Sequence, residues 1–256
     1  LQLNPLPVFD LDDSYILCVN SNGTEVLDPL VLDTGLSTPL YSFEWFLNGT
    51  LIAGETQGSY SPTQEGAYSV TVTDTSAFLT TGCSSSDTTQ VIESTPPIVI
   101  ARVTSAAFSD FHVIEVSVEG IGEYEYSLDA GPWQDQAIFE DVSLGEHTVT
   151  ARDINGCGEG SYKVIVLDYP KFFTPNNDTY NDTWNITGID SQPNAKIYIF
   201  DRYGKLLKQL SPTGSGWDGI YNGNPLPSSD YWFTVEYNEP NTGAIKEFKA
   251  HFTLKL

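Results

Sequence analysis

Three short runs near the C-terminus decide the fold of this chain: FFTPNNDTYNDTW (Phe172–Trp184), IYIFDRYGKLL (Ile197–Leu207) and GWDGIYNGNPLPSSDYWF (Gly216–Phe233). Each run joins aromatic residues to residues that favour turns. The segment 174–178 (TPNND) predicts a turn, because Pro fixes φ and Asn and Asp tolerate the left-handed region. The apolar residues from Ile197 to Phe200 predict a strand, and Tyr231–Tyr237 predicts another. We therefore expect strands joined by tight turns in this region.

The order and spacing of these motifs resemble a known family. From Tyr169 to Leu256 the chain is similar to the gliding-motility-associated C-terminal domain, which is the type B sorting domain of type IX secretion in Bacteroidota. The resemblance is carried by Phe173, Pro175, Asn176, Asp178, Asn181, Asp182, Trp184, Ile199–Lys205, Gly216–Gly219, Leu226-Pro227, Asp230–Trp232 and His251–Lys255. The family has glycines where this chain has Asn177, Thr179 and Ala250.

This resemblance implies a non-enzymatic protein that type IX secretion exports across the outer membrane. The family implies docking to the outer-membrane translocon, its shuttle and associated β-barrel proteins, followed by release or by display at the cell surface in association with the outer membrane. We expect the C-terminal strand to supply an edge for docking. The expected contact residues are Arg202, Lys205, Phe252, Leu254 and Lys255. For each cation, the alternative is an ordinary solvated surface charge.

Composition extends the same fold class to the whole chain. The 256 residues contain no long apolar stretch with helical periodicity, whereas Thr, Ser, Val, Tyr and Gly are abundant. We predict an all-β protein of three tandem Ig-like β-sandwich modules, at residues 1–95, 96–168 and 169–256. The first two are similar to the Ig-like repeats of large Bacteroidota surface adhesins. A semi-rigid linker is expected at Ser94–Pro97, because two prolines favour an extended chain.

The net negative charge lies almost entirely in the first two modules. The formal net charge is -23; residues 1–95 contain twelve Asp or Glu and no Lys or Arg, residues 96–168 thirteen against three, and residues 169–256 nine against eight. Nucleic acid is excluded as a partner, because binding phosphates requires a basic face. The acidic surface keeps an extracellular protein soluble, or alternatively binds Ca²⁺ between modules.

No apolar run is long enough to span a membrane. The chain also begins without a basic-then-apolar leader and contains no Met, so we interpret it as the C-terminal part of a longer, processed protein.

The first module carries the pattern of an Ig-like sandwich. Leu40–Leu47 reads as a strand, and Asn48-Gly49 after it is a strong hairpin signal. Trp45 lies between Cys18 and Cys83, as the core tryptophan of Ig domains lies between two cysteines. We predict a Cys18–Cys83 disulfide, which would stabilise the fold by about 4 kcal/mol on the chain-entropy estimate. The alternative is two buried free thiols.

The second module repeats part of the first. GAYSVTVTD (Gly66–Asp74) followed by Gly82-Cys83 matches GEHTVTARD (Gly145–Asp153) followed by Gly156-Cys157. Such an internal repeat indicates a modular array. Cys157 has no evident partner; it is either a free buried thiol or the partner of a cysteine that precedes this chain.

No motif for catalysis is present. The sequence contains no nucleophile elbow, no paired metal-ligand histidines, no Cys-x-x-Cys and no phosphate-binding glycine loop. We therefore expect no enzyme activity and no cofactor other than a cation. Asp178, Asn181 and Asp182 form the strongest candidate metal site, because clustered oxygen ligands suit Ca²⁺. The alternative is that these side chains cap backbone N–H groups in an Asx-rich turn.

We therefore interpret the chain as the C-terminal part of a large secreted adhesin or gliding-type surface protein, whose last domain directs type IX secretion. A rival hypothesis is the carbohydrate-binding accessory region of a secreted glycan-degrading enzyme, supported by Trp133, Trp217 and Trp232. Exposed, coplanar tryptophans would favour this rival. A third hypothesis is a subunit of the gliding or adhesion machinery itself.

Overall fold

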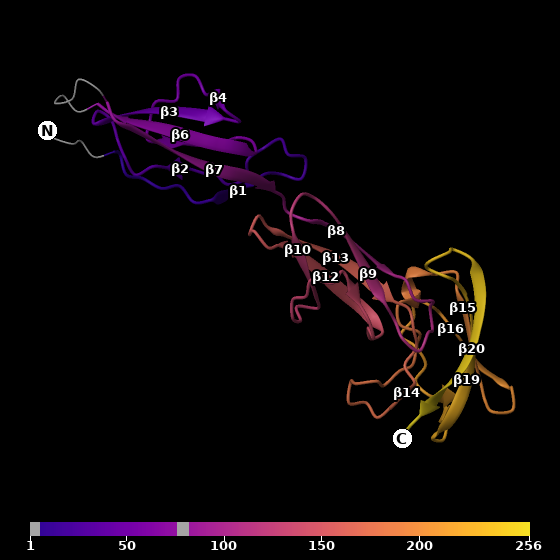
Figure 1. Ribbon diagram of the computed structural model, residues 1–256. Coiled ribbons are helices and arrows are strands. Elements are labelled where there is room, and N and C mark those ends of the chain that lie inside the picture. Colours follow the sequence, from indigo (N-terminus) through magenta and orange to yellow (C-terminus); the bar gives the residue numbers. More distant parts are fainter. Residues whose placement is uncertain (1–5, 76–81) are drawn as a thin grey trace. The chain divides into compact units, whose positions relative to one another are not determined.

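The computed structural model is built from β-strands, which confirms the predicted all-β class (Figure 1). It describes residues 6–75 and 82–256. Within that part the only helical element is the 3₁₀ turn η1 (Ile189–Ser191), and no helix is long and apolar enough to cross a membrane. Packing divides the chain into two units. Unit 1 comprises residues 1–98, 118–125 and 151–160; unit 2 comprises residues 99–117, 126–150 and 161–256.

The first module of unit 1 is built on a five-stranded sheet with the order β1-β7-β6-β3-β4. These strands are β1 (Ser14–Cys18), β3 (Tyr41–Leu47), β4 (Thr50–Leu51), β6 (Gly66–Asp74) and β7 (Ser84–Ser94), while β2 (Leu32–Asp33) pairs with β5 (Ser59–Tyr60). Trp45 is fully buried, and its indole N–H donates to the Gln57 carbonyl at 2.9 Å. Asn48 and Gly49 have φ of 49° and 77°, the left-handed turn that the Asn-Gly pair predicts.

The segment between the first and last modules forms two three-stranded sheets. One has the order β11-β9-β8, from β8 (Ile98–Val103), β9 (Ile114–Glu119) and β11 (Ile138–Phe139). The other has the order β10-β12-β13, from β10 (Tyr124–Leu128), β12 (Gly145–Asp153) and β13 (Glu159–Val166). Along β12, His147, Val149, Ala151 and Asp153 alternate inward, as a strand with one buried face requires.

The C-terminal domain is built on a sheet with the order β14-β20-β19-β15-β16. Its strands are β14 (Phe172–Phe173), β15 (Lys196–Phe200), β16 (Leu206–Leu210), β19 (Ser229–Asn238) and β20 (Ile245–Leu254), with a hairpin of β17 (Ile220–Tyr221) and β18 (Asn224–Pro225). Trp184 stacks on Phe252 at 3.8 Å between ring centroids, and both rings are fully buried. Many aromatic residues of the motifs therefore form the core, namely Phe173, Trp184, Trp217, Tyr231 and Phe233 together with Phe252.

A loop from outside this domain completes its core. Phe108, which lies between β8 and β9, is 7% exposed and stacks on Phe248 at 4.5 Å, with Tyr237 edge-on at 5.0 Å. Next to it, the Ala107 N–H donates to the carboxylate of Glu239, which also accepts from the Tyr237 hydroxyl and the Lys246 ammonium. Phe108 and Glu239 thus fix this loop to one end of β19.

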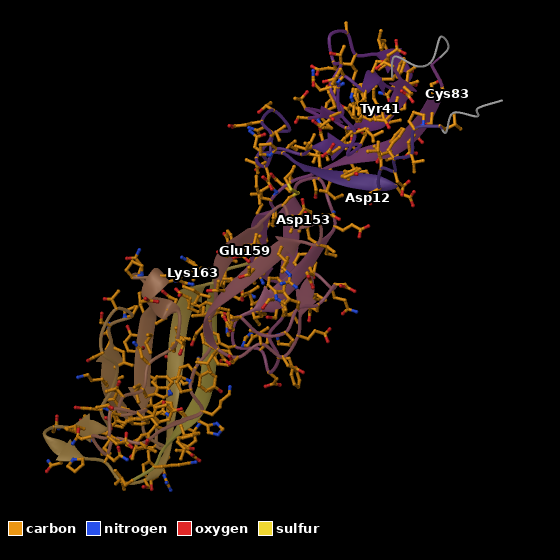
Figure 2. The ribbon with its side chains drawn as sticks, turned by 90° about the vertical axis from the view of Figure 1, so that its left-hand side faces the viewer. Asp12, Tyr41, Cys83, Asp153, Glu159 and Lys163 are labelled. Atoms are coloured by element: carbon orange, nitrogen blue, oxygen red, sulfur yellow. A yellow bond between two sulfur atoms is a disulfide. The ribbon has the colours of Figure 1, made fainter. Side chains whose placement is uncertain are left out.

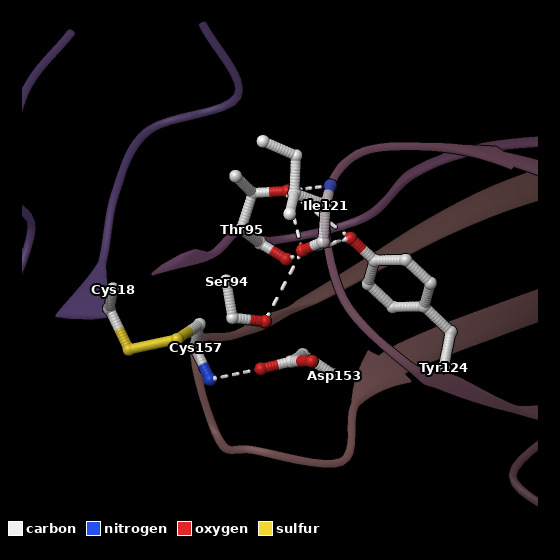
Figure 3. The surroundings of a disulfide bond; sticks show 7 residues. All are labelled: Cys18, Ser94, Thr95, Ile121, Tyr124, Asp153 and Cys157. Carbon is white, nitrogen blue, oxygen red and sulfur yellow. Dashed lines mark hydrogen bonds between the residues drawn. A yellow bond between two sulfur atoms is a disulfide. The ribbon is translucent and has the colours of Figure 1, made fainter. Parts of the chain in front are cut away.

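The predicted Cys18–Cys83 disulfide is wrong. Cys18 is bonded to Cys157, with the two Cα atoms 5.1 Å apart, and Cys83 is a free thiol (Figure 3). The reason is register: β1 runs parallel to β7 with Cys18 opposite Ser94, whereas Cys83 precedes Ser84 at the other end of β7. Ten residues of strand separate these ends by about 33 Å, and a disulfide needs Cα atoms within about 7 Å.

The disulfide lies beside a closed junction in unit 1. Ser94 and Thr95, from the expected linker, are fully buried. The Thr95 N–H donates to the Ile121 carbonyl at 2.8 Å, the Ile121 N–H donates to the Thr95 hydroxyl at 2.8 Å, and the Tyr124 hydroxyl donates to the Thr95 carbonyl (Figure 3). Residues 94–95 are therefore held in place by the loop 118–125 instead of running free through solvent.

Candidate partner-binding site

The turn between β15 and β16 projects two cations and a tyrosine from one end of the C-terminal domain. The Asp201 carboxylate accepts hydrogen bonds from the backbone N–H groups of Tyr203 at 2.8 Å and Lys205 at 2.9 Å. Gly204 has φ of 81°, a left-handed conformation that glycine adopts without steric cost. Because Asp201 is engaged with the backbone, the side chains of Arg202, Tyr203 and Lys205 are left on the surface, and Tyr203 is 88% exposed.

This turn forms one wall of a cleft of about 470 Å³, and residues 226–231 form the opposite wall. The Arg202 guanidinium donates to the Ser229 hydroxyl across the cleft. The Lys205 ammonium lies 4.6 Å from the centre of the Tyr221 ring, a cation–π contact. Burial raises the pKa of the Tyr231 hydroxyl at the base of the cleft, and the nearby positive charge of Arg202 lowers it in part.

The end of the chain lies in an adjoining hollow of about 550 Å³, which Arg202 also lines. The Lys255 N–H donates to the Phe173 carbonyl at 3.0 Å, and its ammonium lies 4.2 Å from the centre of the Phe172 ring. The Leu256 N–H donates to the Ser228 hydroxyl at 2.9 Å. The C-terminal tail is thus fastened beside the cationic turn.

Arg202, Lys205 and Lys255 are the cations of this end, which we call the cationic end. In the part of the chain that the structure describes, none of the three forms an ion pair, whereas Lys171, Lys196, Lys246 and Lys249 each lie within 4.0 Å of a carboxylate. Asp230, the other nearby acid, accepts from the Thr253 hydroxyl at 2.7 Å. The cationic end can therefore offer its charges to an acidic group of a partner, with Tyr203 as an aromatic contact.

The loop of the candidate metal site has its carboxylates directed at backbone N–H groups. Asp182 accepts from the N–H groups of Asn176 at 3.0 Å, Asn177 at 2.7 Å and Thr179 at 2.8 Å. Asp178 accepts from the Asn176 side chain and the Tyr180 N–H, and these two bonds lower its pKa. Asn181 is exposed. Among the described residues, no three His, Cys, Asp or Glu gather as they would around a metal ion.

The backbone of this loop explains why the family has glycines there. Asn177 and Thr179, which occupy the glycine positions of the first motif, have φ of 62° and 74°. Asn tolerates this region, whereas a β-branched residue such as Thr does so only at a cost. The loop therefore keeps the glycine conformation without the glycines.

Comparison with known families finds a match in the C-terminal domain. Residues 167–253 match the family model of the CHU_C type IX secretion signal domain. The C-terminal domain is a type IX secretion signal domain. The chain is accordingly a protein that type IX secretion exports to the cell surface or releases, and its signal domain interacts with that machinery.

Several solved structures of Ig and related domains are similar to the chain. They include the amphioxus IgVJ-C2 molecule (14% identity, 60% of this chain and 98% of that chain, TM-score 0.35). The fibronectin(III)-like modules of Clostridium thermocellum CbhA are 15% identical, with 63% of this chain and 95% of that chain covered and a TM-score of 0.34. Drosophila N-cadherin EC1-3 is 11% identical, with 95% of this chain and 99% of that chain covered and a TM-score of 0.26. No curated protein matches the chain.

Two residues of the signal domain that were predicted to contact a partner, Phe252 and Leu254, lie in its core instead. Phe252 and Leu254 are fully buried, since β20 alternates these inward residues with His251 and Thr253. Phe252 packs on Trp184 and lies 5.9 Å from Phe173 between ring centroids. In the folded domain they cannot contact a partner, so the prediction that they dock is corrected: they are core residues.

The tryptophans proposed as a sugar platform do not lie on one surface. Trp217 is 1% exposed and donates from its indole N–H to the Ile220 carbonyl at 3.1 Å, whereas Trp232 is 41% exposed. A buried Trp217 cannot stack on a sugar. Three residues that line the cleft, Tyr203, Tyr221 and Ser229, were not predicted from the sequence. The Tyr-Asn-Gly turn at 221–223 was a usable signal for Tyr221, whereas nothing local indicates that Ser229 faces Arg202.

Proposed function

We propose that the cationic end of the signal domain docks on the outer-membrane translocon of type IX secretion, on its shuttle and on the associated β-barrel proteins. The observation that carries this proposal is the convergence at one end of the domain of three cations without ion pairs, a nearly fully exposed tyrosine and the segment Lys255–Leu256. Elsewhere in the described part of the domain, Lys171, Lys196, Lys246 and Lys249 are paired with carboxylates, and Lys208 stands alone on β16. The complementary surface of the partner would be acidic and would carry groups that accept hydrogen bonds from Arg202.

The two preceding modules are the exported cargo in this proposal. They supply the surface function of an adhesin or gliding-type protein, without enzyme activity, and the mature protein is associated with the outer membrane. Their acidic charge opposes self-association at the cell surface. The near-neutral signal domain is free of that repulsion when it approaches an acidic partner.

The test is export of a reporter placed ahead of this chain in a bacterium that has type IX secretion. The test variant reverses the three charges: Arg202→Glu, Lys205→Glu and Lys255→Glu. Each lost surface contact costs less than about 1 kcal/mol of binding free energy, so the three together cost about 2 kcal/mol. This loss corresponds to binding that is about thirtyfold weaker. We expect surface reporter to fall and periplasmic reporter to accumulate.

The matched control reverses Lys171, Lys196 and Lys208, which changes the net charge equally but involves no residue that lines the two hollows of the cationic end. This control should export normally. Equal export of the triple variant and the wild type would contradict docking by the cationic end. Deleting Phe252–Leu256 would not test the proposal, because the deletion removes two core side chains and unfolds the domain.

A further inference from the structure

Cys83 and Cys157 occupy the same place in two repeats. Each lies between a nine-residue strand that runs from Gly to Asp and the strand that follows it in sequence: Cys83 between β6 and β7, and Cys157 between β12 and β13. The N–H of the last strand residue donates across the turn in both. In the first repeat Asp74 donates to the Cys83 carbonyl at 3.0 Å; in the second, Asp153 donates at 2.9 Å to the carbonyl of Gly158, the residue after Cys157. The residue that accepts this bond is therefore Cys83 itself in the first repeat and the neighbour of Cys157 in the second, although Asp74 and Cys83 are four positions further apart in sequence than Asp153 and Gly158.

The incoming polypeptide also lies beside this turn in both repeats. In the first, the Ser85 hydroxyl donates to the Pro7 carbonyl at 2.7 Å. In the second, the Pro96 side chain lies 3.3 Å from the place that a Cβ on Gly158 would occupy. In both repeats the incoming chain therefore lies beside a residue that closely follows the cysteine in sequence.

Cys18 is the residue that forms a disulfide with Cys157 in the second repeat. It ends β1 opposite Ser94, which ends β7 just before the chain passes into the next repeat. A cysteine at the end of the first strand therefore lies at the outgoing end of its module, and it bonds to the turn cysteine of the next repeat. Cys83 lies at the other end of unit 1 from Asp153, the neighbour of Cys157 (Figure 2). It is half-buried and is a free thiol in this chain.

We propose that Cys83 is a disulfide site for the first-strand cysteine of another Ig-like module of the same kind joined ahead of this one. The bond would continue the arrangement of Cys18 and Cys157, so that each junction in an array of such modules is closed by one disulfide. A lone cysteine would carry no such inference; the bonded equivalent in the same chain and the matching path of the incoming chain carry it.

The chemistry is thiol–disulfide exchange with a protein disulfide of the kind that oxidises thiols in the bacterial periplasm. One cysteine thiolate attacks the oxidant and forms a mixed disulfide. The second thiolate then displaces the oxidant sulfur and forms the new S–S bond. The two cysteines together lose two protons and two electrons, and the oxidant leaves as a dithiol.

The test is a tandem protein in which residues 1–97 are followed directly by residues 8–256. Joining Pro97 to Val8 gives Pro97 the place of Pro7. Cys83 of the added copy is replaced by Ser, which leaves Cys18 of the added copy, Cys18, Cys83 and Cys157. After oxidative refolding, thiols are alkylated in denaturant without reductant and counted by intact mass. We expect no alkylated thiol in the tandem and one, Cys83, in the original chain.

The control tandem carries Cys18→Ser in the added copy only, and it should show one alkylated thiol. Peptide mapping must find Cys157 linked to the Cys18 peptide in the control tandem, where only the original Cys18 remains, which establishes that the original junction folds in the tandem. Two alkylated thiols in the first tandem, or a Cys83 peptide linked to Cys157, would overturn the proposal.

Discussion

Replacing Phe108 by Ala tests whether the signal domain depends on a loop outside its own sequence. The Phe108 ring is 7% exposed and lies against Phe248 and Tyr237 of the signal domain. Truncating a buried Phe costs about 3–5 kcal/mol, and we take about 3 kcal/mol because this ring lies at the edge of the core. Alanine keeps a Cβ at the φ of 60°, so backbone strain is unchanged and the loss reports on the ring alone.

The assay is calorimetry of the full chain, in which two units can melt separately. For a unit of this size a loss of about 3 kcal/mol lowers Tm by about 9 °C. Only the transition of unit 2 should move. Phe111→Ala is the matched control, because Phe111 lies in the same loop and is 69% exposed. If both variants melt alike, Phe108 does not complete the core and the reasoning fails.

Three further predictions concern the signal domain. Thr179→Gly should relieve the strain of a φ of 74°, which raises the free energy of unfolding of unit 2 by about 1 kcal/mol and so raises its Tm. Asn177→Gly should change the Tm little, and a lower Tm for Thr179→Gly would contradict the strain. Asp182→Ala should cost about 2 kcal/mol by removing the acceptor of three backbone N–H groups, and unchanged urea unfolding would refute that role. Burial raises the pKa of Glu239, but its bonds to Lys246, Ala107 and Tyr237 outweigh burial and lower it below 4.5. Its contribution to stability is therefore complete above pH 4.5 and is lost as pH falls through the lowered value. Glu239→Gln should make the Tm of unit 2 less sensitive to pH between neutral and acidic buffers, and equal sensitivity would exclude Glu239 as the cause.

Local patterns in the sequence predicted most of the fold. The Asn48-Gly49 turn and the alternation in Gly66–Asp74 and Gly145–Asp153 correspond to observed elements, because turn chemistry and side-chain alternation act over a few residues. The burial of Phe252 and Leu254 was also readable, since His251–Lys255 alternates polar and apolar residues. The prediction that they contact a partner followed the family resemblance and disregarded this local pattern.

What the sequence could not predict are pairings between distant segments. Cys18 had two candidate partners, and only the parallel register of β1 with β7 shows that one of them lies at the wrong end of the sheet. Phe108 stands in a loop without periodicity, and its contact with Phe248 spans two predicted modules. The same holds for the cleft, where the Arg202–Ser229 bond joins two turns that no short motif relates.

The two ends of β19 have different roles in the signal domain. At Tyr237 the strand meets Phe108, so this end is closed by the preceding segment. At Ser229 it meets Arg202 and the segment Lys255–Leu256, so that end carries the cations of the cationic end. Eight residues of strand hold these ends about 27 Å apart. A partner that docks on the cationic end therefore need not displace Phe108. A different cargo in place of the preceding modules can leave docking intact while it changes the stability of the signal domain. Comparing Phe108→Ala with the charge-reversed variant in export and in calorimetry separates the two roles: the first should lower Tm, and the second should lower export at unchanged Tm.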